Sequence, residues 1–326
     1  MSATEFRDRN FIIFAYKFSL MISICIPVYN YDVRPLVHEL HRQANSIKPQ
    51  VEILLADDAS SLIYQHLNKP LQHMANVVYH QLPANIGRSR IRNLLAQKAR
   101  YRWLLFMDCD SGVISDRFLL DYAAQTHSLQ VVCGGRVYSK ETPQKPFVLH
   151  WKYGVNREVK GASRRNLSPY HSFMTNNFMV PKEILTLIPF DESISGYGHE
   201  DTLWGFELMR RKLPVLHIDN PLCHIDLENH QDFLQKSAHA ISNLFNIYLR
   251  SPEPESFAKF VRILRWQYLA YKSLPGRWLL SLVWLSKSLF HKLLKANNPN
   301  LLWYDLLRIA WLNRHWKKHY NNSPSR

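Results

Sequence analysis

Short apolar runs alternate with helical patterns through much of this 326-residue chain. Runs of this kind are typical of buried strands, whereas apolar residues that recur every three or four positions are typical of helices. Such alternation predicts an α/β fold around a mostly parallel sheet, in which ligands bind beyond the carboxyl ends of the strands. The expected strands cover residues 22–26, 51–56, 77–80, 103–107, 130–133, 178–180 and 215–218, and the expected helices cover 33–44, 88–99, 117–128 and 201–212.

Two segments do not follow this alternation. Residues 138–172 are polar, basic and contain proline, and we expect a long, mobile loop there. From about residue 229 the pattern is helical to the end, with breaks at Pro252-Glu253-Pro254 and at Asn297-Asn298-Pro299. The sequence therefore predicts a catalytic or binding domain over 21–228 and a helical C-terminal region over 229–326.

Acidic residues follow two of the expected strands. Asp108 and Asp110 come directly after the apolar run 103–107, and two carboxylates at a strand end can both face a divalent cation that prefers oxygen ligands. Asp57 and Asp58 follow the run 51–56, where a carboxylate can accept hydrogen bonds from a nucleobase or a ribose. The structural alternative for both pairs is a turn, because Asp is common in turns.

A cluster of arginines opens the expected helix after Gly87. Arg88, Arg90 and Arg92 lie near the start of this helix, and helix N-terminal amides with guanidinium groups suit a diphosphate. The alternative is a solvated basic face.

The run Gly196-Tyr197-Gly198-His199-Glu200-Asp201 combines a flexible turn with two carboxylates at a helix start. The helix dipole there keeps Asp201 ionised, as a general base requires, although helix capping explains the same residues. His224 follows a later strand; it is either a packed histidine or a metal ligand beside the two aspartates.

Taken in order, these motifs resemble glycosyltransferase family 2. The motifs are Pro27-Val28-Tyr29-Asn30, Asp57-Asp58-Ala59-Ser60, Asn85-x-Gly87 with Arg92-Asn93, Asp108-x-Asp110 and Gly198-His199-Glu200-Asp201. The resemblance covers about residues 21–228 and implies a GT-A fold, a Rossmann-like nucleotide-binding mixed sheet flanked by helices. The run from Gly196 to Asp201 also resembles a motif of galactosyl- and N-acetylgalactosaminyltransferases.

The resemblance also implies roles for the site residues. A nucleotide-sugar donor, expected to be a UDP-sugar, and manganese or magnesium are the implied ligands. The implied donor-binding residues are Pro27, Tyr29, Asp57, Asp58, Gly87, Arg92 and Asp108; the implied metal ligands are Asp108, Asp110 and His224; and the implied catalytic residues are Asp201, as general base, and Glu200 beside it.

These roles describe an inverting reaction. A metal and basic groups stabilise the departing diphosphate, and a carboxylate takes the proton of the attacking acceptor hydroxyl. A single displacement then turns an α-linked donor sugar into a β-linked product. We expect a glycan or lipid-linked glycan acceptor, in cell-surface polysaccharide or glycolipid synthesis.

The charge of the chain is concentrated near its end. The formal net charge is +15, and residues 251–326 hold thirteen Lys and Arg against three acids, together with six of the nine tryptophans. A Trp-rich basic helical segment favours an anionic membrane surface, and the alternative is that it packs on the catalytic domain. No nucleic-acid partner is expected.

Cellular location is indicated by two further features. The four cysteines form no CxxC pair, which favours a reducing compartment, so we expect a cytoplasmic protein, peripheral on the inner face of the cell membrane. Residues 11–26 are apolar but contain Lys17, and we interpret Met21 as the natural start and 1–20 as an upstream extension.

Two other functions are compatible with parts of the sequence. A catalytically inactive basic protein on the same fold would bind nucleic acid or membrane, but Asp108, Asp110 and Asp201 favour an enzyme. A nucleotidyltransferase also uses an α/β domain and a metal, but no glycine-rich phosphate loop follows the first expected strand.

Overall fold

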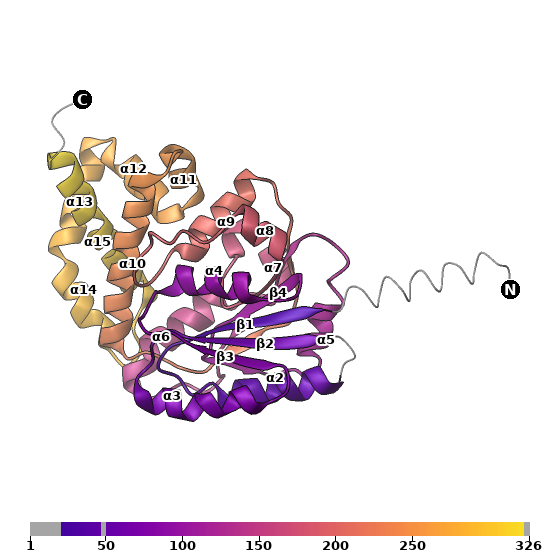
Figure 1. Cartoon of the computed structure of the whole chain (residues 1–326). Coiled ribbons are helices and arrows are strands. Elements are labelled where there is room, and N and C mark those ends of the chain that lie inside the picture. Colours follow the sequence, from indigo (N-terminus) through magenta and orange to yellow (C-terminus); the bar gives the residue numbers. More distant parts are fainter. Residues whose placement is uncertain (1–20, 47–49, 323–326) are drawn as a thin grey trace. The chain divides into compact units, whose positions relative to one another are not determined.

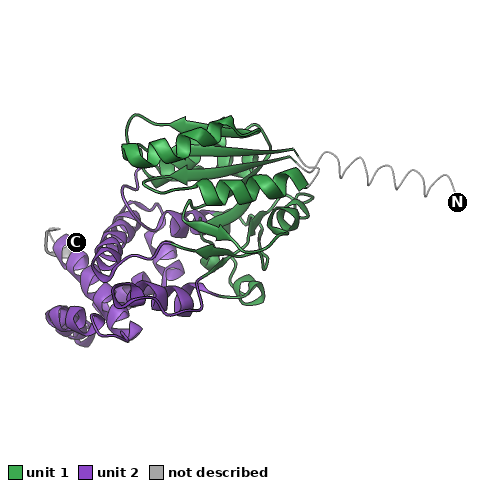
Figure 2. Cartoon of the chain, turned by 90° about the horizontal axis from the view of Figure 1, so that it is seen from below, with its two compact units in different colours: residues 1–137, 160–192, 208–225 green, residues 138–159, 193–207, 226–326 purple. Residues whose placement is uncertain are grey.

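The structure of the chain is a computed structural model that describes residues 21–46 and 50–322. The extension expected over 1–20 lies outside the described residues. The chain forms two compact units, shown in green and purple in Figure 2. Unit 1 consists of Met1–Val137, Lys160–Glu192 and Leu208–Ile225, and unit 2 of Tyr138–Val159, Ser193–Glu207 and Asp226–Arg326.

Unit 1 contains a seven-stranded sheet in the order β3-β2-β1-β4-β8-β6-β9. β8 is antiparallel to its neighbours β4 and β6, and the other pairs are parallel. A smaller sheet, which the sequence did not predict, has the order β5-β10-β7. The strands are β1 Ile22–Val28, β2 Val51–Asp57, β3 Val77–Gln81, β4 Trp103–Met107, β5 Ser111–Val113, β6 Val131–Cys133, β7 Arg136–Val137, β8 Asn177–Pro181, β9 Val215–His217 and β10 Leu222–His224.

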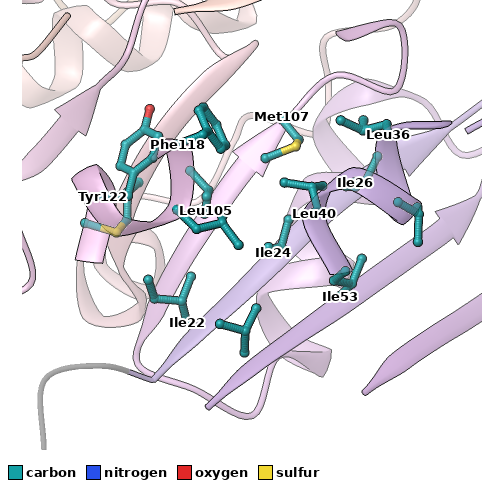
Figure 3. Packing of buried hydrophobic residues seen from close by; sticks show 14 of the residues in the cluster. Ile22, Ile24, Ile26, Leu36, Leu40, Ile53, Leu105, Met107, Phe118 and Tyr122 are labelled. Carbon is teal, nitrogen blue, oxygen red and sulfur yellow. The ribbon is translucent and has the colours of Figure 1, made fainter. Parts of the chain in front are cut away.

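The central strands form because their residues are almost entirely buried. β2 and β4 are buried along their whole length, as apolar strands covered on both faces must be. Helices α2 (Arg34–Ser46) and α4 (Arg88–Lys98) lie on opposite faces of the sheet (Figure 1). Figure 3 shows the face covered by α2, where Leu36 and Leu40 pack among the strand residues Ile24, Ile26 and Ile53. The predicted α/β fold is confirmed.

The remaining helices of unit 1 are short. They are α3 Leu62–Asn68, η1 Lys69–His73, α5 Phe118–Ala123, α7 Ala162–Asn166, η4 Tyr170–Ser172 and α8 Lys182–Leu187. α5 ends at Ala123, so the helix expected over 117–128 is shorter than predicted. Phe118 and Tyr122 of α5 are fully buried in the same core (Figure 3).

Unit 2 is helical in its described part. Its helices are η2 Lys145–Phe147, α6 Val148–Tyr153, the π-helix η3 Gly154–Glu158, α10 His230–Arg250, α11 Pro254–Phe260, α12 Arg262–Tyr271, α13 Leu274–Leu285, α14 Lys287–Leu294 and α15 Leu301–Asn322. Helix α9 (Glu200–Arg210) begins in unit 2 and ends in unit 1. None of the helices in the described part of the chain has the length and hydropathy of a membrane-crossing segment.

The prediction of a long loop over residues 138–172 is wrong. The segment contains α6, η3 and α7 in place of irregular chain. Val148, Leu149 and His150 of α6 are buried, and the His150 ring stacks on Phe233 at 4.8 Å between centroids. Gly154 lies against the ring of Tyr138, where a Cβ atom would come within 2.2 Å of it. The helices form because these buried contacts outweigh a polar, proline-containing local sequence.

Candidate active site

Asp108 follows the last residue of β4 and is surrounded by arginine side chains of unit 1. Its Oδ1 accepts a hydrogen bond from Arg92 Nη2 at 2.8 Å. Its Oδ2 lies 3.4 Å from Arg136 Nη2 and 3.7 Å from Arg88 Nη2. The Asp108 side chain is 15% exposed and that of Arg92 2% exposed, whereas Arg88 keeps 38% of its side-chain surface open to solvent. The cluster carries more positive than negative charge and suits an anionic ligand.

Asp110 lies beside His224 in the same unit. Residues Ser111 and His224 are partners in the antiparallel pair β5–β10, and the amide of Ile225 donates to the carbonyl of Asp110 at 3.0 Å. This pairing brings Asp110 Oδ2 to 3.4 Å from His224 Nδ1. The Oδ1 of Asp110 is buried and has no hydrogen-bond partner among the described residues.

The environment of Asp110 keeps its carboxylate ionised. Burial acts to raise the pKa of Asp110, but the adjacent imidazole of His224 and the charges of Arg136 and Arg88 lower the pKa to about 2. An ionised oxygen without a hydrogen-bond donor, next to an imidazole, is the ligand chemistry that a divalent cation needs. Within residues 21–46 and 50–322, however, no three His, Cys, Asp or Glu side chains converge to form a ready metal site.

Asp57 and Asp58 hold two loops at the carboxyl edge of the sheet. Asp57 is fully buried; its Oδ1 accepts from the Ser60 amide at 2.7 Å and its Oδ2 from the Tyr79 hydroxyl. Asp58 Oδ1 accepts from the amide of Ile86 at 2.7 Å, and its Oδ2 from the amide of Gly87 at 3.0 Å. Burial raises the pKa of Asp58, and the two amides oppose this shift. Both carboxylates therefore have the turn-forming role considered as the structural alternative.

Gly87 is the N-cap residue of α4 and has φ 84° and ψ 168°. This region of backbone space is essentially restricted to glycine. The conformation aims the Gly87 amide at Asp58 and begins the helix that carries Arg88 and Arg92.

Pro27 and Tyr29 lie at the carboxyl end of β1, next to the end of β2. The amide of Asn30 donates to Ser60 Oγ at 2.8 Å, and Asn30 Oδ1 accepts from the Ser61 amide at 2.8 Å. Tyr29 is 54% exposed. An exposed aromatic ring beside this edge is available to stack on a planar ligand.

The second group of predicted residues belongs to unit 2, in the turn before α9. Gly196, Gly198 and His199 have φ of 72°, 101° and 71°. Asn243 of α10 fixes the turn, because its Nδ2 donates to the carbonyls of Ser195 at 2.8 Å and of Tyr197 at 3.1 Å. Gly198 lies so close to α10 that an added Cβ atom would be 2.5 Å from the Cβ of Ala240.

A short hydrogen-bond chain leads to Asp201. Its Oδ1 accepts from the Thr202 amide at 2.6 Å and lies 3.2 Å from the Thr202 hydroxyl. That hydroxyl also lies 3.0 Å from His199 Nδ1. Burial lowers the pKa of His199 to about 4, aided by the charge of Arg308, so this histidine is neutral at pH 7. Because the hydroxyl donates to Asp201, the His199 tautomer that fits carries its proton on Nδ1.

The structure thus places the predicted residues in two groups. Unit 1 gathers Pro27, Tyr29, Asp57, Asp58, Gly87, Arg92, Asp108, Asp110 and His224 around the carboxyl ends of its strands. Glu200, which is 6% exposed, and Asp201 open α9 in unit 2. The roles assigned to these residues stay predictions.

Two residues of these groups were not found from the sequence. Arg136 is separated from Asp108 by 28 positions and has no motif around it. It follows β6, which runs parallel to β4, so the strand order alone brings it to the same edge. Thr202 follows the Glu-Asp pair, and only the turn geometry reveals its contact with Asp201.

Comparisons with known proteins agree with this fold. The family model described as glycosyl transferase family 2 matches residues 23–186, half of the chain. No curated protein is similar enough in sequence to count as a match.

Two solved structures show the same fold at low sequence identity. The crystal structure of Staphylococcus aureus TarS 1-349 has 15% identity and a TM-score of 0.50, with 94% of this chain and 93% of that chain covered. The mannosyltransferase PcManGT from Pyrobaculum calidifontis has 12% identity and a TM-score of 0.52, with 93% and 88% covered. The family model spans half of the chain and includes the acidic strand ends at Asp57, Asp58, Asp108 and Asp110. The chain therefore belongs to glycosyl transferase family 2.

Proposed function

We propose that this protein is an inverting, metal-dependent glycosyltransferase that moves a sugar from a nucleotide-diphosphate sugar to a hydroxyl group of a glycan or lipid-linked glycan. The observation that carries the proposal is the arginine cluster around Asp108, next to the ionised Asp110. An anionic ligand with a bound cation fits this arrangement, because the arginines suit the anion and the Asp110 carboxylate suits the cation. Family membership supplies the reaction class.

The diphosphate of the donor is proposed to lie against Arg88 and Arg136. Their guanidinium groups lie 3.7 Å and 3.4 Å from Asp108 Oδ2, and the planar fork of an arginine matches the geometry of phosphate oxygens. Arg92 is almost fully buried, and it acts by holding the Asp108 carboxylate in place. As the sugar leaves, the two outer arginines stabilise the charge on the nucleotide diphosphate.

Asp110 and His224 are the residues proposed to hold a divalent metal, with Asp108 beside them. When bound, a manganese or magnesium ion neutralises charge on the departing diphosphate. The free carboxylate oxygen of Asp110 supports this assignment, since a buried ionised oxygen without a donor is costly unless a cation meets it.

Asp201 is the proposed general base, and Glu200 its neighbour in contact with substrate hydroxyls. The Thr202 hydroxyl orients the Asp201 carboxylate, and neutral His199 holds that hydroxyl in turn. A carboxylate positioned in this way removes the proton from an acceptor hydroxyl as the hydroxyl attacks the anomeric carbon. Attack opposite the leaving group inverts the anomeric centre, so an α-linked donor yields a β-linked product.

UDP-sugars are the proposed donors. TarS has been crystallised with UDP, and PcManGT with GDP-Man and Mn2+. Both structures support a nucleotide-sugar donor for this chain. The product is proposed to belong to a cell-surface polysaccharide or glycolipid.

A donor screen tests the proposal. The full chain is incubated with UDP-, GDP- and dTDP-sugars and manganese or magnesium, and released nucleotide is measured. We expect release from one nucleotide class, loss of release with EDTA and recovery with added metal. Absence of release from every donor, with every candidate acceptor, would overturn it.

A further inference from the structure

Helices α13 and α14 of unit 2 turn apolar side chains to the solvent. Trp278 and Leu285 are 72% and 75% exposed, whereas Leu280 is buried. Helices in globular proteins ordinarily point such residues inward. We call these side chains the exposed apolar face; it consists of Leu274, Trp278, Leu279, Leu282, Leu285 and Leu289.

The exposed apolar face is continuous across the two helices. Trp278, Leu282, Leu285 and Leu289 are spaced four, three and four positions apart, which places them on one side of a helix. The connecting residue Ser286 keeps right-handed helical angles, with φ −80° and ψ 0°. The stripe of apolar residues therefore does not break between α13 and α14.

The other side of these helices is anchored in unit 2. Phe290 and Leu294 are buried in a cluster with Leu301, Tyr304 and Leu307 of α15. The Phe290 ring stacks on Trp303 at 5.8 Å between centroids. This packing fixes which side of α13 and α14 remains outside, so the exposure is a property of the folded unit.

Lysine and arginine are abundant, and acidic residues absent, in the segment of chain that contains the exposed apolar face. Residues 256–304 contain eight Lys and Arg and no Asp or Glu. Lys287 Nζ lies 3.7 Å from the centre of the Trp284 ring, and Lys272 Nζ lies 4.3 Å from that of Tyr268. Apolar side chains flanked by cations and aromatic rings match the interface of an anionic bilayer, where the side chains enter the acyl boundary and the cations meet the headgroups.

We propose that the exposed apolar face docks on an anionic lipid bilayer. From Leu274 to Leu289 the face is about 24 Å long, against about 30 Å of hydrocarbon in a bilayer, and its other side is packed on α15, so we place it in the plane of the interface. A second copy of the chain is a poorer occupant, because it would bring two like-charged surfaces together. Docking extends the proposed function toward a lipid-linked acceptor, but it does not require catalysis.

Vesicle flotation of the full chain tests the proposal. The vesicles are phosphatidylcholine with or without about a third of phosphatidylglycerol. The test variant carries Trp278→Gln, Leu282→Gln and Leu285→Gln. The control variant carries Leu129→Gln, Leu167→Gln and Leu187→Gln, three side chains of unit 1 that are 57%, 83% and 55% exposed.

We expect wild type and control to float with anionic vesicles, and the affinity of the test variant for these vesicles to be at least about tenfold lower. Binding should also fall about fivefold for each of Lys287→Gln and Lys292→Gln, and with added salt.

Equal flotation of wild type and test variant would overturn the proposal, as would equal binding to both kinds of vesicle. Self-association of wild type that the test variant loses would assign the face to a second copy instead. Circular dichroism shows that each variant is folded, and none of these readouts depends on transferase activity.

Discussion

Arg92 and Asp108 form a buried ion pair at the carboxyl end of β4, with Nη2 and Oδ1 2.8 Å apart. Arg92 is 16 positions before Asp108 and comes from α4. The pair joins the helix behind Gly87 to the strand end that carries both predicted aspartates.

The first prediction concerns the charge balance of this pair. Asp108→Asn keeps the side-chain shape but leaves Arg88, Arg92 and Arg136 without their shared carboxylate. We expect the free energy of unfolding to fall by about 3 kcal/mol, because the buried Arg92 guanidinium loses the carboxylate of Asp108. Urea unfolding measures this loss.

The matched control for that experiment is Asp116→Asn. Asp116 pairs with Arg42 on the surface, and its side chain is 89% exposed. An exposed pair contributes less than about 1 kcal/mol. Similar losses for the two variants would show that burial does not strengthen the Asp108 cluster.

The second prediction concerns the backbone at Gly87. Gly87→Ala forces an alanine to adopt φ 84° and ψ 168°, although no atom lies within 4 Å of the added Cβ. We expect a loss of about 1–3 kcal/mol from strain alone. Donor binding, measured by calorimetry, should also weaken, because relief of this strain turns the amide of residue 87 away from Asp58.

Gly161→Ala is the control for Gly87→Ala. Gly161 has φ −62°, and the nearest atom to its added Cβ is 4.0 Å away. The change should cost less than about 1 kcal/mol. If both alanine variants were equally stable, the strain assigned to Gly87 would be absent.

The third prediction tests the contact of Gly198 with α10. Gly198→Ala adds a Cβ that overlaps Ala240 and strains a residue at φ 101°. The double variant with Ala240→Gly relieves the overlap but not the strain. We expect the double variant to be more stable, by about 1 kcal/mol or more, than the sum of the two single losses implies. Additive losses in thermal unfolding would contradict the close contact.

The fourth prediction is a pH dependence that comes from His217. Its Nδ1 lies 2.9 Å from Arg165 Nη1, so it accepts, and its Nε2 donates to the carbonyl of Pro169 at 2.9 Å. Burial, with the charge of Arg165, lowers the pKa of His217 to about 4. The unfolded state, with an ordinary histidine pKa of about 6.5, therefore binds a proton first as the pH falls.

The sign of the effect follows from this difference. Above about pH 6.5 the contribution of neutral His217 to the free energy of unfolding is fully present, and this contribution is lost as the pH falls from about 6.5 to about 4. His217→Gln should flatten the dependence of unfolding free energy on pH in that window. A variant with the wild-type slope would show that His217 is not a source of the acid sensitivity.

Much of unit 1 could be predicted because its signals are local. β4 is an uninterrupted apolar run, and β1 and β2 are mostly apolar. Asp57, Asp58, Asp108 and Asp110 lie at or just after strand ends that the parallel order places at one edge. The positions of the strands in the seven-stranded sheet and the α/β architecture follow from these local patterns, whereas the strands of the smaller sheet do not.

Long-range contacts could not be predicted. Arg136 reaches Asp108 only through the strand order. Helix α6 forms because His150 and Leu149 contact Phe233 and His230, which are more than eighty positions away. The pairing of β10 with β5, which brings His224 to Asp110, also has no local signal. The sequence indicates Asp110 and His224 as candidate metal ligands, but it does not show that they lie side by side.

The most direct test of the account compares wild type with Asp201→Asn, using the donor selected by the screen and its acceptor, with released nucleotide as the readout. Asp226→Asn, an exposed acid of the same unit, serves as control. We predict that wild type and control transfer sugar at similar rates and that Asp201→Asn is slower by about 10²–10⁴-fold with unchanged donor affinity. Full activity of Asp201→Asn, or no nucleotide release by wild type, would contradict the account.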